Sequence, residues 1–194
     1  VQEGSITIGG HDVKEFTCDS LLKNMSMVFQ NVYLFHDTIE NNIKFGCPDA
    51  THEQVVEAAK KACCHDFISA LPQGYDTVIG EGGSTLSGGE KQRISIARAM
   101  LKDAPIILLD EATASVDPEN EVHLQQAISA LVKNKTLIVI AHRLSTIRDA
   151  DQILVVDNGK IVEKGVHAEL IQQKGIYQKF WNIRQKARNW KLAQ

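Results

Sequence analysis

Uninterrupted apolar runs alternate with amphipathic stretches along this chain of 194 residues. The runs cover residues 25–29, 106–109, 137–140 and 153–156, and each has the length of a single strand. The stretches between them carry apolar residues at helical spacing. Continuous apolar strands that alternate with helices indicate a mostly parallel sheet with helices on both faces. The pattern therefore predicts an α/β fold with buried strands.

Two helix starts are marked by capping boxes. Thr51 is followed three residues later by Gln54, and Ser87 is followed by Glu90. In such a box the first side chain accepts a hydrogen bond from a helical N–H, and the second side chain accepts one from the cap. Asn158-Gly159, between two apolar runs, predicts a hairpin turn.

Residues 36–93 contain no run that resembles a buried strand and are rich in helical patterns. We interpret them as a helical subdomain inserted into the α/β core. Residues 167–181 also have a helical pattern. The tail at residues 179–194 has basic side chains and no acidic one, which favours a solvated helix over contact with a membrane surface.

The composition excludes some classes of function. The formal net charge of −3 provides no basic field, so no nucleic-acid partner is expected. No apolar run approaches the roughly 20 residues of a membrane span, so any span must come from another segment or chain. The four cysteines form no C-x-x-C pair, which favours reduced thiols over a disulfide or zinc framework.

Polar side chains follow three of the apolar runs. Gln30 follows the first run, Asp110 and Glu111 follow the second, and His142 comes shortly after the third. In an open α/β sheet, ligands bind outside the carboxyl ends of the strands. An amide, two carboxylates and an imidazole at one edge suit a hydrated Mg²⁺, an attacking water and a phosphate.

The helix that starts at Ser87 has an unusual first turn, Ser-Gly-Gly-Glu. The two glycines, Gly88 and Gly89, lower helix propensity by roughly 1 kcal/mol each relative to alanine. They also leave backbone N–H groups uncovered at the positive end of the helix dipole. Such a turn is suited to bind an anion, phosphate in particular.

Taken together, these motifs resemble those of ABC ATPases. Residues 86–93 resemble the signature motif, residues 106–111 the Walker B motif and residues 114–117 the D-loop, with Val116 where leucine is common. Gln30 resembles the Q-loop glutamine and His142 the H-loop histidine. The resemblance implies a RecA-like P-loop NTPase fold, the cofactors ATP and Mg²⁺, and ATPase activity.

The resemblance also implies roles at the sheet edge. Asp110 would organise the Mg²⁺ shell, and Gln30 would approach Mg²⁺ and the attacking water while sensing a transmembrane domain. Glu111 would be the general base, and His142 would contact the γ-phosphate.

A head-to-tail dimer of two such ATPase domains is implied as well, because the signature turn would reach the nucleotide held by the opposite subunit. Asp117 would help to couple the two sites. The residues assigned to nucleotide binding are Ser87, Gly88, Gly89, Glu90, Gln92 and Asp117.

The segment after Gln30, with Leu34-Phe35, Thr38-Ile39 and Asn42-Ile43, resembles the exporter type, as does Gly80-Glu81-Gly82. Many relatives carry an arginine at the position of Gly82 or Gly83, and this chain departs from them there.

From the exporter-like segments we expect an exporter ATPase at the cytoplasmic face of a plasma or inner membrane, with a transmembrane domain as partner. Two alternatives stay open: a soluble ABC ATPase that acts on ribosomes or DNA complexes, and a dimerisation module without catalysis.

No P-loop string, G-x-x-x-x-G-K-[ST], occurs in the chain. Residues 1–6 resemble the segment that follows the P-loop helix, so the expectation is an ABC ATPase domain that lacks its N-terminal part. The chain alone is then expected to bind Mg·ATP very weakly. We also expect an unpaired sheet edge near Ile138 and Ile153, where the P-loop strand would lie.

Overall fold

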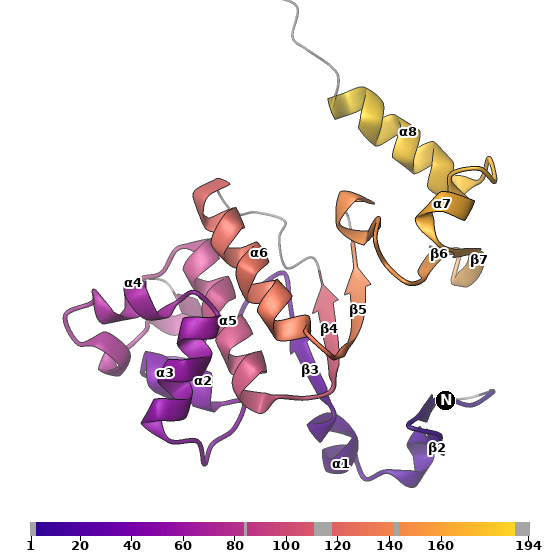
Figure 1. Ribbon diagram of the computed structural model, residues 1–194. Coiled ribbons are helices and arrows are strands. Elements are labelled where there is room, and N and C mark those ends of the chain that lie inside the picture. The colour runs from indigo at the N-terminus through magenta and orange to yellow at the C-terminus, as the bar shows by residue number, and fades with distance from the viewer. Residues whose placement is uncertain (1–2, 84, 111–117, 142–143, 189–194) are drawn as a thin grey trace, which may run out of the picture. The chain divides into compact units, whose positions relative to one another are not determined.

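The computed structural model describes residues 3–83, 85–110, 118–141 and 144–188 (Figure 1). Contacts divide the chain into two compact units, Val1–Ile140 and Ala141–Gln194. None of the described helices is both long and apolar enough to cross a bilayer.

The first unit combines short strands with a group of helices. Its strands are β1 (Thr7–Ile8), β2 (His11–Asp12), β3 (Met25–Val28), β4 (Ile106–Asp110) and β5 (Thr136–Ile140). Its α-helices are α1 (Cys18–Lys23), α2 (Ile39–Lys44), α3 (His52–Lys61), α4 (His65–Ser69), α5 (Gly88–Lys102) and α6 (Pro118–Val132). Short 3₁₀ turns are η1 (Val13–Glu15), η2 (Gly74–Asp76) and η3 (Glu81–Gly83).

A parallel sheet in the order β3-β4-β5 forms the α/β part of this unit. On β3 and β4 the alternate residues Val28, Ile107 and Leu109 are buried in the core, as the apolar runs predicted. The prediction of burial is wrong for β5, whose five residues are all exposed. The physical reason is that β5 is an end strand that pairs with β4 alone among the described strands, which confirms the expected open edge near Ile138.

The helix α5 is the centre of the helical region, where it packs against α2, α3, α6 and strand β3 (Figure 1). Both predicted capping boxes are confirmed, at the starts of α3 and α5. The core around α5 includes side chains with no exposed surface, such as Ile43, Val55 and Ile94. This single cluster joins the helices to the buried face of the sheet.

Two adjacent cysteines, Cys63 and Cys64, lie just after the end of α3. The helix ends at Lys61, and Cys63 shortly after it adopts a left-handed backbone with φ of 54°. Cys63 is partly exposed, whereas Cys64 is fully buried. Burial raises the pKa of the Cys64 thiol to about 12, so this thiol stays protonated at neutral pH.

The second unit contains the predicted hairpin, formed by β6 (Ile153–Asp157) and β7 (Lys160–Gly165). It also contains the turn η4 (Leu144–Ile147) and the helices α7 (His167–Leu170) and α8 (Ile176–Arg188). The prediction of a single helix over residues 167–181 is therefore wrong, because α7 ends at Leu170 and α8 begins only at Ile176. The carboxylate of Glu163 accepts hydrogen bonds from the N–H groups of Ile176 and Tyr177, so it caps a new helix start there.

Candidate functional site

The carboxyl ends of β3 and β4 bring two predicted site residues to one edge of the sheet. Val28, the last residue of β3, pairs with Leu109, and Asp110 ends β4 directly after it. Gln30 follows β3 by two residues and is exposed, and Asp110 is half-buried. Carboxylate and amide oxygens are hard ligands of the kind that Mg²⁺ takes in proteins. These two side chains therefore fit a hydrated Mg²⁺.

Three other predicted site residues, Glu111, Asp117 and His142, lie outside the described residues, and their roles stay predictions. Among the residues that the structure does describe, no group of three or more His, Cys, Asp or Glu side chains could hold a metal ion.

The first turn of α5 has the geometry expected for an anion site. The Ser87 hydroxyl accepts from the Glu90 N–H at 3.3 Å, and the Glu90 carboxylate accepts from the Ser87 N–H at 2.8 Å. Ser87 and Gly88 are exposed, and a Cβ built on Gly88 would meet no atom within 4 Å. A phosphate can therefore approach this backbone closely, at the positive end of a helix of 15 residues.

Unlike the exposed Ser87 and Gly88, the residues Glu90 and Gln92 have side chains that are engaged in hydrogen bonds within the protein. The Glu90 carboxylate is already engaged in the cap. Gln92 is only 4% exposed, and its side-chain amide donates to the backbone carbonyl of Phe29 at 3.2 Å. A glutamine committed in this way holds parts of the protein together, a role that the sequence did not indicate because Phe29 is 63 residues away.

Arg93, the next residue, is also buried. Its guanidinium donates to the side-chain oxygen of Asn120 in α6 and lies 5.3 Å from the ring centroid of Phe67 in α4. A buried arginine between an amide and an aromatic face fixes the relative position of the helices that supply them. Gln92 and Arg93 thus tie α5 to the sheet and to α6.

Sequence reasoning also missed a cluster of exposed aromatic rings, Tyr33, Phe35 and Phe45, which we call the aromatic patch. Tyr33 is 56% exposed and Phe45 63% exposed. The centroids of Tyr33 and Phe35 are 5.4 Å apart, and those of Phe35 and Phe45 are 4.7 Å apart. Adjacent exposed aromatic rings are typical of a surface that binds another protein.

Arg98 of α5 supports the aromatic patch from beneath. Its guanidinium carbon lies 5.8 Å from the Phe35 centroid and 5.4 Å from the Phe45 centroid. Its Nε donates to the backbone oxygen of Asn42 at 2.8 Å. Burial lowers the pKa of Arg98 to about 10, which still leaves it charged at neutral pH. The patch is therefore an ordered surface built on the same helix as the signature turn.

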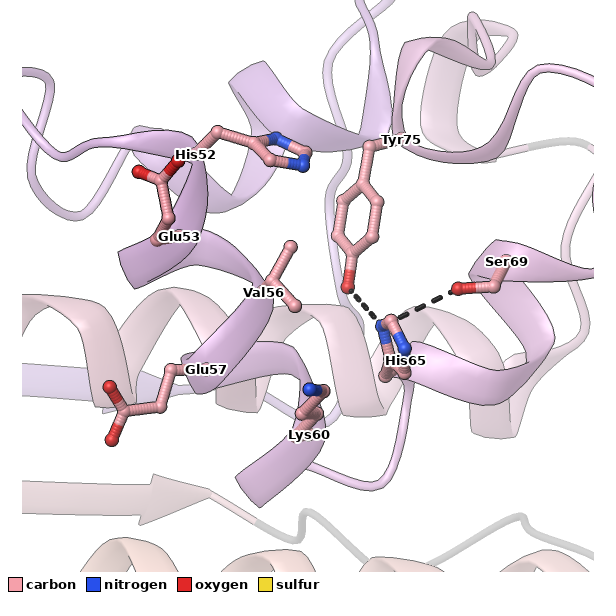
Figure 2. A pocket seen from close by; sticks show the side chains of 8 residues that line it. All are labelled: His52, Glu53, Val56, Glu57, Lys60, His65, Ser69 and Tyr75. Carbon is pink, nitrogen blue, oxygen red and sulfur yellow. Dashed lines mark hydrogen bonds between the residues drawn. The ribbon is translucent and has the colours of Figure 1, made fainter.

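A separate cavity of about 620 Å³ lies between α3, α4 and η2 (Figure 2). Tyr75 points its hydroxyl toward His65, whose Nδ1 lies 3.0 Å from that oxygen, and the Ser69 hydroxyl approaches the same nitrogen at 3.4 Å. These polar groups satisfy one another, and none of the predicted site residues lines the cavity. We interpret the cluster as a contact that stabilises the packing of α3 and α4.

Comparisons with known proteins agree with this geometry. A sequence model of the ABC transporter family matches residues 1–114. An ATP-dependent lipid A-core flippase of Vibrio cholerae serotype O1 is 52% identical over 184 residues, which are 94% of this chain and 32% of the relative. A Staphylococcus aureus protein, named for multidrug export as an ATP-binding/permease protein, is 52% identical over 183 residues, 94% of this chain and 32% of its own length.

A solved structure has the same fold. It is a bacterial Atm1-family ABC exporter with ATP bound, which is 44% identical and superimposes with a TM-score of 0.88. The match covers 99% of this chain and 33% of the exporter. The chain thus spans about one third of the length of the relatives that it resembles.

Proposed function

Because the chain belongs to the ABC transporter family, we propose that its residues form part of the ATP-hydrolysing domain of an exporter. The observation that carries this proposal is the first turn of α5. Ser87 and Gly88 are exposed at the positive end of a long helix, and no atom lies within 4 Å of a Cβ built on Gly88, which is an arrangement that lets a phosphate approach the backbone. Gln30 and Asp110 at the sheet edge add the oxygen ligands that Mg²⁺·ATP requires.

The proposed chemistry divides the roles among these residues. Asp110 and Gln30 would hold the hydrated Mg²⁺, which neutralises charge on the phosphates when bound. Glu111 would accept a proton from the attacking water, and His142 would contact the γ-phosphate. In a head-to-tail dimer of two such domains, the turn at Ser87 would donate N–H groups to the nucleotide held by the partner domain.

The aromatic patch is proposed as the contact with the transmembrane domain. Tyr33, Phe35 and Phe45 are exposed, adjacent to one another and held by Arg98. Exposed rings on an ordered support bury apolar area on binding without a large cost in conformational entropy. This surface would place the domain at the cytoplasmic face of the membrane. The names of the relatives agree on export and differ in what is exported, so export is the proposed function.

A direct test uses the full-length protein that carries these residues, purified and reconstituted in proteoliposomes. We expect Mg²⁺-dependent ATP hydrolysis and ATP-dependent flipping of a fluorescent phospholipid analogue or accumulation of a lipophilic dye. Glu111→Gln should bind ATP and lose turnover by about 10²–10⁴-fold. Glu57→Gln, at an exposed position of α3, is the control and should keep full turnover.

Three results would contradict parts of the proposal. Turnover near that of the wild type in Glu111→Gln would remove the general base. Transport of every probe in the absence of ATP would argue against an exporter. An ATPase rate that is the same with and without reconstitution into a membrane would favour a soluble ATPase.

A further inference from the structure

The buried side chain of Gln92 joins the signature helix to the residue that precedes Gln30. Gln92 lies in the second turn of α5, and its amide donates to the carbonyl oxygen of Phe29 at 3.2 Å. Phe29 stands between the end of β3 and Gln30. A buried side-chain amide that donates to a backbone carbonyl contributes little net stability, but it fixes geometry because leaving the buried amide unpaired is costly.

A second anchor holds the far side of the same segment. Six residues after Gln92 on the same helix, Arg98 donates to the carbonyl oxygen of Tyr33 at 3.4 Å and to that of Asn42 at 2.8 Å. Gln30 therefore lies in a short span between two points, Phe29 and Tyr33, that are both bonded to α5.

The backbone of the following turn approaches α5 closely as well. A Cβ built on Gly46 would lie 2.3 Å from the carbonyl oxygen of Arg98. The buried amide of Asn42 donates to the Phe35 and Thr38 carbonyl oxygens at 3.0 Å each and accepts from Phe35 N–H at 2.9 Å. These contacts hold the segment after Gln30 in place. The hydrogen bond from Gln92 to the Phe29 carbonyl, at the start of that segment, therefore determines where Gln30 lies.

We propose that Gln92 is a positioning residue for ATP hydrolysis, which holds Gln30 in register with the phosphate-binding turn at Ser87. The inference rests on the proposed function, since it assigns Gln92 an effect on the Mg²⁺ ligand Gln30. Gln92 does this through the Phe29 carbonyl and touches no nucleotide itself. The signature turn and Gln30 then move as one body when α5 moves.

A double-mutant cycle in the full-length protein separates positioning from simple structural support. Gln92→Met keeps the length of the side chain and removes the donor, and Gln92→Leu is the second variant if the first does not fold. Each is combined with Gln30→Ala, and kcat, the KM for ATP and the dependence of rate on Mg²⁺ concentration are measured. Ser95→Ala, another buried polar position of α5, is the matched control.

We expect Gln92→Met to lower kcat by about tenfold, as small displacements of catalytic groups do, and to raise the Mg²⁺ requirement. The KM for ATP and the melting temperature should stay close to those of Ser95→Ala. In the Gln30→Ala background, the same substitution should change kcat by less than about twofold, because the group it positions is gone.

The outcomes distinguish this inference from the proposed function. If Gln30→Ala and Glu111→Gln lower turnover but Gln92→Met has the wild-type kcat, or if its effect multiplies that of Gln30→Ala, the positioning role is wrong and the proposed function stands. If Gln30→Ala and Glu111→Gln are both harmless, the proposed function fails, and the role of Gln92 fails with it.

Discussion

The helices around α5 and the strand β5 both carry branched aliphatic side chains, yet the surroundings of those side chains differ. Ile43 and Ile94 are fully buried, and the polar groups among them, such as the Asn42 amide, have hydrogen-bond partners. Along β5, every residue is exposed, Ile138 by 54%. Burial therefore follows from the neighbours that an element has, and an apolar run alone does not determine it.

The largest expected difference in stability comes from replacing one isoleucine by alanine in each region. Ile43→Ala should destabilise the chain by about 2–5 kcal/mol, because it leaves a cavity among packed helices. Ile138→Ala removes the same atoms from an exposed position and should cost less than about 0.5 kcal/mol. Urea unfolding followed by circular dichroism measures both, and equal losses would contradict the contrast.

Gly46 tests how closely the helical region is packed. A methyl group there would meet the Arg98 carbonyl oxygen at 2.3 Å, so Gly46→Ala must push α2 and α5 apart. We expect a loss of about 1–3 kcal/mol. In Gly88→Ala the new methyl group meets nothing within 4 Å, and stability should be unchanged or higher, since alanine favours a helix. Thermal melts of both variants decide the matter.

A smaller effect is expected at Glu40 in α2, whose side chain is 16% exposed. Partial burial by itself would raise its pKa, but hydrogen bonds from Lys44 and His52 outweigh burial and hold the pKa below the ordinary value. A lowered folded-state pKa means that the stabilisation is present above the unfolded pKa and is lost as pH falls through the folded pKa.

Glu40→Gln should therefore cost about 0.5–1 kcal/mol at pH 7. The difference from wild type should shrink as pH falls below about 4, where the carboxylate takes up a proton in both states. Stability measured against pH provides the test. Glu57→Gln, which removes an exposed pair with Lys61, should show no measurable change, and a Glu40→Gln deficit that persists in acid would exclude the ionic explanation.

The smallest thermodynamic effect, with a clear effect on solubility, is expected at the open edge. Ile138→Lys places a charge on an exposed strand whose pairing groups invite other strands. The free energy of unfolding should change by less than about 0.5 kcal/mol, while aggregation of the 194-residue chain should slow. Light scattering over time, with Val122→Lys at an exposed position of α6 as control, checks this prediction.

Local features of the fold could be predicted from the sequence, because their partners are close in the chain. The boxes at Thr51 and Ser87 connect residues three apart, and the Asn158-Gly159 turn connects adjacent strands. The shared edge of Gln30 and Asp110 was also predictable, since parallel strands end on the same side.

The remaining features depend on contacts that no spacing indicates. The partner of Gln92 is 63 residues away, and Arg98 reaches a segment at residues 33–45 from the far end of its helix. The exposure of β5 could not be read from its apolar residues, because it depends on which strands pair with it. The break before α8 depends on Glu163, which belongs to a different element.

The neighbouring thiols at the end of α3 give the helical region a chemical reporter of its own. Cys63 is accessible to solvent, whereas Cys64 is buried and its pKa is raised to about 12. A maleimide can modify a thiolate only when the side chain is exposed. The rate at which Cys64 is alkylated, compared with that of Cys63 beside it, therefore measures how often the core around Cys64 opens in the native protein. Hydrogen exchange would give the same opening rate averaged over many amides.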